Sequence, residues 1–131
     1  EVHRTYHALV EGKPEEESGT INEWLLEDKF LRVKAVNKRN PQAREAITHW
    51  NIQDYDGTAS LIQLTIETGR RHQIRVGLAN LGCPVIGDTQ HGATGNPIGR
   101  IALHATSLEF LHPENDDPVR FEAPIPFGPE N

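Results

Sequence analysis

The sequence contains no methionine, a single cysteine and no long apolar run. One cysteine, Cys83, excludes an internal disulfide and suits a reducing compartment, so we expect a cytoplasmic protein. Cys83 lies between Gly82 and Pro84 beside an apolar stretch, which favours a packed thiol over a nucleophile. No apolar run approaches the roughly twenty residues that cross a bilayer, and no signal-peptide pattern is present. We therefore expect a soluble protein with no membrane partner.

Two further absences concern the histidines and the first residue. None of the seven histidines stands at a metal-ligand spacing from cysteine or glutamate, so we expect no metal site. The chain opens with Glu1 rather than methionine, and we expect it to be part of a longer protein. Its 131 residues correspond to one domain, which buries about two-thirds of the surface that its unfolded chain exposes.

Acidic side chains outnumber lysine and arginine, 19 to 13, which gives a net charge of −6. This balance argues against an RNA partner, because phosphate binding depends on lysine and arginine. The charges are nevertheless segregated along the chain. Acids crowd residues 11–28 and 114–130, whereas residues 32–44 carry five basic side chains and no acid, and an arginine-rich octet follows at 68–75. The pattern allows a local basic surface on an acidic domain.

The octet Thr68–Arg75 lies at the junction of two apolar segments. Residues 62–66 alternate apolar and polar side chains, which predicts a half-buried strand. Residues 71–81 repeat apolar side chains at helical spacing until Gly82, which predicts a helix. Gly69 allows a tight turn between them, and free amide groups at the helix start add to the charge of three arginines. The octet is therefore predicted to bind a phosphate or carboxylate, the alternative being solvated arginines paired with surface acids.

The remaining patterns predict mostly antiparallel strands with one principal helix, which is an α+β domain. Alternation predicts a strand over 30–36, and Asp56-Gly57 predicts the turn of a β-hairpin. A short helical turn is predicted over 21–26. The other predictions are strands at 6–10, 43–55, 59–68, 84–86, 100–110 and 119–123, and loops at 37–42 and 92–99.

Several motifs follow one another at consistent spacing. They are Tyr6–Gly12, Ala43–Trp50, Thr68–Arg75, Leu81–Asp88, Arg100–Ala105, Leu111–Pro113 and Phe121–Pro124. Together they closely resemble the C-terminal half of the RluA-type family of RNA pseudouridine synthases, over nearly the whole chain. The resemblance implies the pseudouridine synthase catalytic fold, no cofactor, and structured ribosomal or transfer RNA whose target uridine is flipped out of the stack.

The resemblance also implies roles for individual residues. Arg75 would be the cationic partner that keeps a catalytic aspartate ionised, because its planar fork of donors fits a carboxylate. Ile74 would pack under the flipped uracil. Tyr6 would stack on the base and help to move the C5 proton. Arg70, His72 and Gln73 would lie at the rim of the substrate site or behind it, in phosphate contact or stabilising the turn.

Three further residues are assigned without a direct role in the site. Arg71 stands where the family usually has a small hydroxyl residue. His104 lies in an apolar strand and is expected to be a hydrogen-bonded structural histidine. Asp88 follows Val85–Gly87 at a strand end, where a turn or capping role is the default.

One motif of the family is missing from the sequence. Its catalytic aspartate belongs to an upstream motif, His-Arg-Leu-Asp-x-x-Thr-Ser-Gly, and none of the six aspartates here stands in that context. We therefore expect residues 1–131 to be the C-terminal portion of a catalytic domain, inactive alone, whose Arg75 awaits a carboxylate from elsewhere. The missing N-terminal half is then a candidate partner. The alternative is a non-catalytic RNA-binding or protein-interaction module with the same fold.

Overall fold

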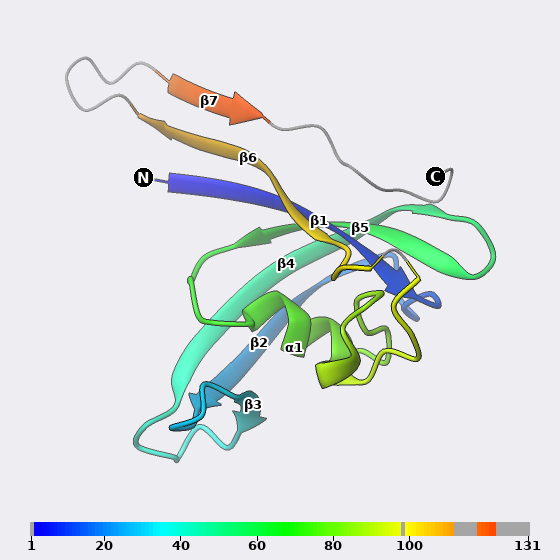
Figure 1. Cartoon of the computed structure of the whole chain (residues 1–131). Helices are drawn as coiled ribbons and strands as arrows, with labels where there is room; N and C mark the ends of the chain where they lie inside the picture. Colours follow the sequence, from blue (N-terminus) through cyan, green and yellow to red (C-terminus); the bar gives the residue numbers. More distant parts are fainter. Residues whose placement is uncertain (1, 98, 112–117, 123–131) are drawn as a thin grey trace.

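The computed structural model describes residues 2–97, 99–111 and 118–122 (Figure 1). These residues form seven strands, an α-helix and a 3-10 helix. In chain order they are β1 (Val2–Glu11), β2 (Ser18–Glu27), β3 (Val33–Val36), β4 (Arg44–Tyr55), β5 (Ala59–Ile66), α1 (Gln73–Asn80), η1 (Thr89–His91), β6 (Leu103–Leu111) and β7 (Pro118–Glu122).

All seven strands belong to one sheet, in the order β3-β2-β4-β5-β1-β6-β7. Every neighbouring pair is antiparallel, which confirms the predicted α+β class. The predicted hairpin joins β4 and β5, and the Asp56 carboxylate accepts the backbone N–H groups of Thr58 and Ala59 there. This aspartate fixes the turn, because it satisfies amides that the end of the ladder leaves unpaired.

Helix α1 and the segment that follows it lie against one face of the sheet (Figure 1). The core between them includes the fully buried side chains of Val10, Ile62, Leu64 and Leu78. The helix approaches β2 closely, since a Cβ on Gly77 would lie 3.1 Å from Ile21 Cδ1. Burial of one face explains the alternating pattern of the central strands and fixes their register.

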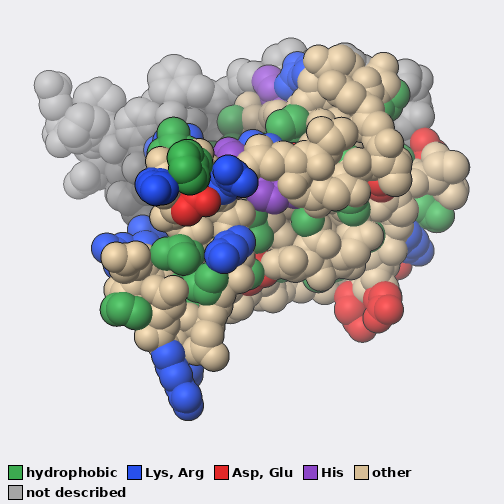
Figure 2. Space-filling view, turned by 60° about the horizontal axis from the view of Figure 1, so that its bottom comes forward, with side chains coloured by type: hydrophobic (Ala, Val, Ile, Leu, Met, Phe, Trp, Pro, Cys, Tyr) green, Lys and Arg blue, Asp and Glu red, His purple; other side chains and the backbone are tan. Residues whose placement is uncertain are grey.

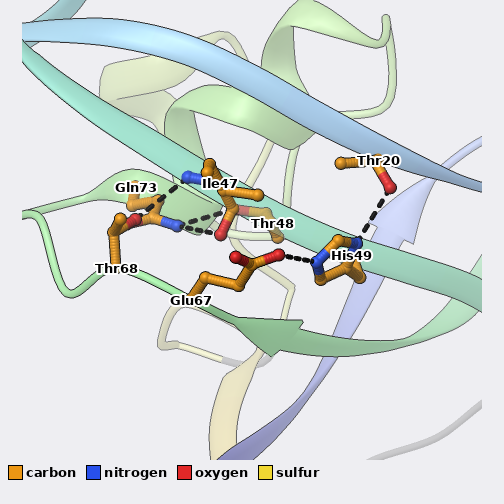
Figure 3. Close-up of polar contacts among 7 residues, drawn as sticks. All are labelled: Thr20, Ile47, Thr48, His49, Glu67, Thr68 and Gln73. Atoms are coloured by element: carbon orange, nitrogen blue, oxygen red, sulfur yellow. Dashed lines mark hydrogen bonds and ion pairs between the residues drawn. The ribbon is translucent and has the colours of Figure 1, made fainter.

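The opposite face of the central strands carries polar side chains. His49 on β4 lies between Thr20, whose Oγ1 is 2.9 Å from its Nδ1, and the carboxylate of Glu67 (Figure 3). On β1 the His7 Nε2 lies 2.9 Å from Gln53 Oε1. Burial lowers the pKa of His7, although the hydrogen bond to Gln53 opposes this shift.

For His104, predicted to be a hydrogen-bonded structural histidine, the structure describes one of the two ring nitrogens as unpaired. Its Nε2 is buried and has no hydrogen-bond partner among the described residues. The cross-strand neighbour of His104 in the β1–β6 ladder is His7, whose Nε2 is already engaged by Gln53.

Two predicted elements differ from the structure around β2 and β3. The helical turn predicted at 21–26 was wrong, because these residues belong to β2 and pair with β4 and, from Trp24 onward, with β3. Strand pairing on both sides outweighs a local helical pattern. The strand predicted at 30–36 is limited to β3, because Phe30 and Leu31 form a turn in which Leu31 has a φ of 62°.

The helix and the later strands also differ in their bounds. Helix α1 begins at Gln73 rather than Arg71, because His72 takes a left-handed conformation with a φ of 56°. It ends at Asn80, and Gly82 follows with a φ of 85° as the sequence predicts. The strand predicted at 84–86 is only an isolated bridge between Val85 and Val10.

Four motif residues, His112, Pro113, Ala123 and Pro124, lie outside the described residues. The described helices are too short or too polar to span a bilayer. Within the same ranges, no cluster of three or more His, Cys, Asp or Glu side chains could hold a metal ion.

Candidate active site

A cavity of about 260 Å³ opens where the octet meets β1. All six residues predicted for the site line it, although they come from positions 6 and 70–75. The lining consists of Arg4, Tyr6, Ile66, Gly69, Arg70, His72, Gln73, Ile74, Arg75 and Leu103. Its lining combines apolar side chains with three arginines, which suits a planar base attached to a phosphate backbone.

Strand pairing brings Tyr6 to the octet. Tyr6 lies opposite Leu64 in the β1–β5 ladder, and β5 leads directly into the octet and α1. The Tyr6 ring packs against the core, whereas its hydroxyl makes no hydrogen bond with the described residues. Ile74 is 6% exposed in the first turn of α1 and supplies an apolar wall. A ring and an aliphatic side chain therefore flank the same space.

Gln73 is buried and holds the octet to β4 (Figure 3). Its Nε2 donates to the Ile47 carbonyl at 2.9 Å and to Thr48 Oγ1 at 2.8 Å. Its Oε1 accepts from Thr68 Oγ1 at 2.8 Å and from the Arg70 amide at 3.1 Å. These bonds satisfy both ends of the amide, so they give Gln73 the turn-stabilising role.

His72 occupies the position before α1 in the left-handed region, where a non-glycine residue is uncommon, and its side chain makes no capping hydrogen bond. Its ring meets His91 of η1 edge to face, with centroids 5.5 Å apart. Burial lowers the pKa of both histidines, and the nearby Arg75 charge lowers them further, against an opposing effect of Asp88. At neutral pH the positive charge of the cavity therefore comes from its arginines.

Arg75 already has a carboxylate partner within this chain, which the sequence analysis did not foresee. Its Nε donates to Asp88 Oδ2 and its Nη2 to Asp88 Oδ1, each at 2.8 Å. The Asp88 side chain is 0% exposed and that of Arg75 15%. The expectation that this chain offers no carboxylate to Arg75 was wrong, because the loop after Val85 folds back over α1. Arg75 still has Nη1, which makes no hydrogen bond with the described residues.

Gly87 explains how Asp88 reaches Arg75. Gly87 has a φ of 87°, and a Cβ there would lie 2.3 Å from the Arg100 carbonyl oxygen. Only glycine fits this bend, which turns the next residue inward. The Asp88 backbone does form the predicted turn by accepting the amides of His91 and Ala93, but its side chain caps no helix. The Gly87-Asp88 pair was the sequence feature available here, and it indicates a turn rather than a buried ion pair.

The other two arginines of the octet, Arg70 and Arg71, are exposed at the surface of the protein. Arg70 donates through Nε to the Glu45 carbonyl at 2.8 Å, while its side chain lines the cavity. Arg71 points away and pairs with the exposed carboxylate of Glu27 at the end of β2. The solvated-arginine alternative therefore holds for Arg71, and such an exposed pair adds little stability.

Three residues that line the cavity are not among those predicted from the sequence. Arg4 stands two positions before Tyr6 on β1, and alternation along a strand places both side chains on one face. Ile66 and Leu103 contribute from β5 and β6. The two-residue alternation of β1 could have indicated that Arg4 shares a face with Tyr6. The position of Leu103 in the cavity depends on the pairing of β1 with β6, which the sequence does not show.

Comparisons with known proteins give one consistent result. The family model described as RNA pseudouridylate synthase matches residues 1–80. The RNA pseudouridine synthase YhcT of Bacillus subtilis is 38% identical over 130 residues, which are 98% of this chain and 42% of the relative. Ribosomal large subunit pseudouridine synthase D of Xanthomonas campestris is 34% identical over 140 residues, covering 96% of this chain and 41% of the relative.

Two solved human structures are similar to the fold. RNA pseudouridylate synthase domain containing 1 superposes with a TM-score of 0.81 and 26% identity, over 98% of this chain and 57% of that chain. Human RNA pseudouridylate synthase domain containing 4 superposes with a TM-score of 0.76, over 95% of this chain and 58% of that chain. At 20% identity, this similarity supports the fold alone. The chain spans less than half the length of the two bacterial relatives. On the family match and these relatives, the chain belongs to the RluA-type RNA pseudouridine synthases.

Proposed function

We propose that this chain supplies the arginine and tyrosine side of an active site that converts uridine in structured RNA to pseudouridine. The observation that carries the proposal is the single cavity that unites Tyr6, Ile74 and Arg75. The aspartate that acts at the sugar is proposed to come from outside the 131 residues, for instance from an N-terminal half of the domain. A cytoplasmic location is part of the same proposal.

The reaction breaks the bond between uracil N1 and ribose C1′, turns the base, and forms a bond between C5 and C1′. The proton at C5 leaves, and N1 ends with a proton, so no cofactor is consumed. Flipping the uridine out costs a few kcal/mol, which stacking in a pocket offsets. The Tyr6 ring and Ile74 would hold the base while it turns, and the Tyr6 hydroxyl would help to transfer the proton from C5.

Arg75 would serve two carboxylates at once. Nε and Nη2 are held by Asp88, which fixes the plane of the guanidinium. Nη1 is the donor left for the incoming catalytic aspartate. Asp88 is thus a positioning residue, because it aims the arginine without touching the substrate.

A chimera tests the proposal in a complete protein. The chain would replace the matching 42% of YhcT, and RNA tritiated at uracil C5 would report isomerisation through release of tritium. We expect the chimera to release tritium. Its Arg75→Ala variant should be at least about 100-fold slower, because the catalytic aspartate would lose the cationic partner that keeps it ionised. A folded, equally active Arg75→Ala chimera would remove Arg75 from the mechanism.

The chain alone tests the remaining parts of the proposal. We expect no tritium release without the aspartate, and turnover would show that the catalytic carboxylate has been misplaced. We also expect tighter binding to a duplex with one bulged uridine than to the same duplex without the bulge, with the preference lost in Tyr6→Ala. A chimera that binds RNA without turnover would favour the non-catalytic module.

A further inference from the structure

The turn between β2 and β3 presents two apolar side chains, flanked by basic ones, to solvent. Residues 28–32 form this turn, and we call them the basic tip. Within it, Phe30 is 64% exposed and Leu31 54%. Among the large apolar side chains that are exposed in the described residues, these two are the most exposed.

The basic tip is held in a fixed shape. The Asp28 carboxylate accepts the amides of Phe30 at 2.8 Å and Arg32 at 3.0 Å, and the Leu31 amide donates to the Asp28 carbonyl at 3.0 Å. The bonds from Arg32 and Phe30 also lower the pKa of Asp28, which therefore stays ionised as a cap. Leu31 keeps a φ of 62° within this frame, a strained conformation for a branched side chain. The frame preorganises Phe30 for contact with a partner.

Basic side chains surround the Phe30 ring. Lys29 Nζ lies 5.2 Å and Arg32 Cζ 5.3 Å from its centroid. Residues 29–44 carry six lysines and arginines and no acid, within a chain whose net charge is −6. On the face drawn in Figure 2, lysine and arginine side chains gather beside exposed apolar ones and close to the histidines. This combination of charge and aromatic surface suits a single nucleic-acid strand.

A groove lies between the basic tip and η1, and its η1 side contacts residues of the candidate active site. It has a volume of about 400 Å³, and it is lined by Leu26, Asp28, Arg32, Val33 and Lys34 from the β2–β3 region and by Gln90 and His91 from η1. The Asp28 carboxylate is already occupied by the amides of the tip, which leaves Arg32 and Lys34 as the charged donors of the groove. Gln90 Oε1 lies 3.4 Å from Arg75 Nη2, and His91 contacts His72. A strand whose uridine enters the cavity at Arg75 would therefore have the groove and the tip within reach.

We propose that the basic tip is a stacking platform for a nucleotide that flanks the target uridine in single-stranded RNA. The flanking base stacks on Phe30, and its phosphates contact Arg32 and Lys34 in the groove. The proposal rests on the proposed function for the position of the strand, and it adds the side chains that read the strand outside the cavity. RNA is preferred to an acidic protein segment because the tip pairs an exposed aromatic ring with two cations, Lys29 and Arg32.

Binding to RNA without uridine tests the platform separately from uridine recognition. Fluorescence anisotropy would measure the affinity of the chain for labelled oligocytidylate. Phe30→Ala should weaken binding about 5- to 150-fold, the range expected for loss of one base–aromatic stack, and Phe30→Trp should restore it. The Arg32→Gln, Lys34→Gln double variant should lower the slope of log affinity against log salt by about 1.4, since each phosphate contact contributes about 0.7.

The matched control is Tyr55→Ala. Tyr55 is also exposed, at 41%, and Lys13 Nζ lies 5.4 Å from its ring centroid, but it stands at the far end of β4. We expect this variant to bind like the wild-type chain. Equal affinity in all variants, or equal losses in Phe30→Ala and Tyr55→Ala, would overturn the proposal.

Two further measurements distinguish this proposal from docking of an acidic protein and from the proposed function itself. If polyglutamate binds as tightly as oligocytidylate and depends on Phe30 to the same degree, the tip docks acidic protein and the proposal is wrong. If Phe30→Ala weakens oligocytidylate binding while the chain shows no preference for a bulged uridine, the platform stands and the proposed function fails. Circular dichroism of each variant verifies that it is folded.

Discussion

Replacing Asp88 with asparagine removes a buried charge and keeps the size of the side chain. Its carboxylate is 0% exposed and accepts two hydrogen bonds of 2.8 Å from Arg75. Asparagine retains one acceptor oxygen, but its amide turns a donor toward a guanidinium that is itself all donors. Leaving one charge of a buried pair uncompensated costs about 3–5 kcal/mol, and the remaining acceptor places Asp88→Asn near 3 kcal/mol. For a domain of this size that loss lowers Tm by about 10 °C.

Urea unfolding, followed by tryptophan fluorescence, measures this loss. Trp50 is a suitable reporter, because it is 6% exposed in the core that α1 covers. The control is Glu16→Gln, a charge removal on an exposed loop, which should change the free energy of unfolding by less than about 0.5 kcal/mol. If Asp88→Asn costs no more than this control, the ion pair does not hold the loop to α1.

A double-mutant cycle tests whether the loss of stability in Asp88→Asn comes from the Arg75–Asp88 ion pair. Arg75→Met alone should also destabilise the fold, because it leaves the Asp88 charge buried without a partner. The double variant Arg75→Met, Asp88→Asn should lose at least about 1 kcal/mol less than the sum of the single losses. Additive losses would show that the two side chains act independently.

Three other predictions concern the frame of the site. Gly87→Ala should cost about 3 kcal/mol in urea unfolding, since its Cβ would meet the Arg100 carbonyl at 2.3 Å and φ is positive; a loss under about 1 kcal/mol would contradict the bend. The pKa of His72 in the folded chain is lowered from 6.5, so as pH falls His72 is protonated in the unfolded chain before it is protonated in the folded chain. The contribution of His72 to the free energy of unfolding is therefore kept above pH 6.5 and lost as pH falls below it. Asparagine tolerates positive φ, so His72→Asn should reduce the slope of the free energy of unfolding against pH, measured by urea unfolding at several pH values. An unchanged slope would refute the reasoning. In the chimera, Tyr6→Phe should keep binding to a bulged uridine while tritium release falls about 100-fold or more; unimpaired release would exclude the hydroxyl from proton transfer.

The sequence predicts the fold well wherever a pattern reports on one face of one element. Alternation at 62–66 identifies β5, and Gly82 identifies the end of α1, because each signal is local. The segment at 21–26 was mistaken for a helical turn because its partners lie more than twenty residues away, in the β2–β4 pairing of Ile21 with Thr48 and Asn22 with Ile47. Pairing of that kind leaves little trace in the strand itself.

In the candidate site too, the features that a local pattern reports were predictable, and those that depend on distant pairing were not. The octet is contiguous, and its resemblance to the family is enough to identify the octet side chains that line the cavity. Arg4 and Leu103 enter through strand pairing, which local patterns do not report. Asp88 was assigned to a turn because the sequence shows its glycine and its strand end but not the helix that the loop folds over. Its backbone forms that turn, while its side chain pairs with Arg75.

The Arg75–Asp88 pair changes how a loss of activity at Arg75 must be interpreted. From sequence alone, Arg75→Ala should abolish activity and leave the fold intact. The structure makes the same guanidinium the partner of a carboxylate that is 0% exposed, so removing it destabilises the loop that carries Gln90 and His91. Arg75→Lys separates the two roles, because a lysine keeps the charge for Asp88 but lacks the fork that holds two carboxylates at once. We expect Arg75→Lys to retain more stability than Arg75→Ala while losing nearly as much turnover in the chimera. Equal losses of stability would mean that geometry, rather than charge, holds the loop in place.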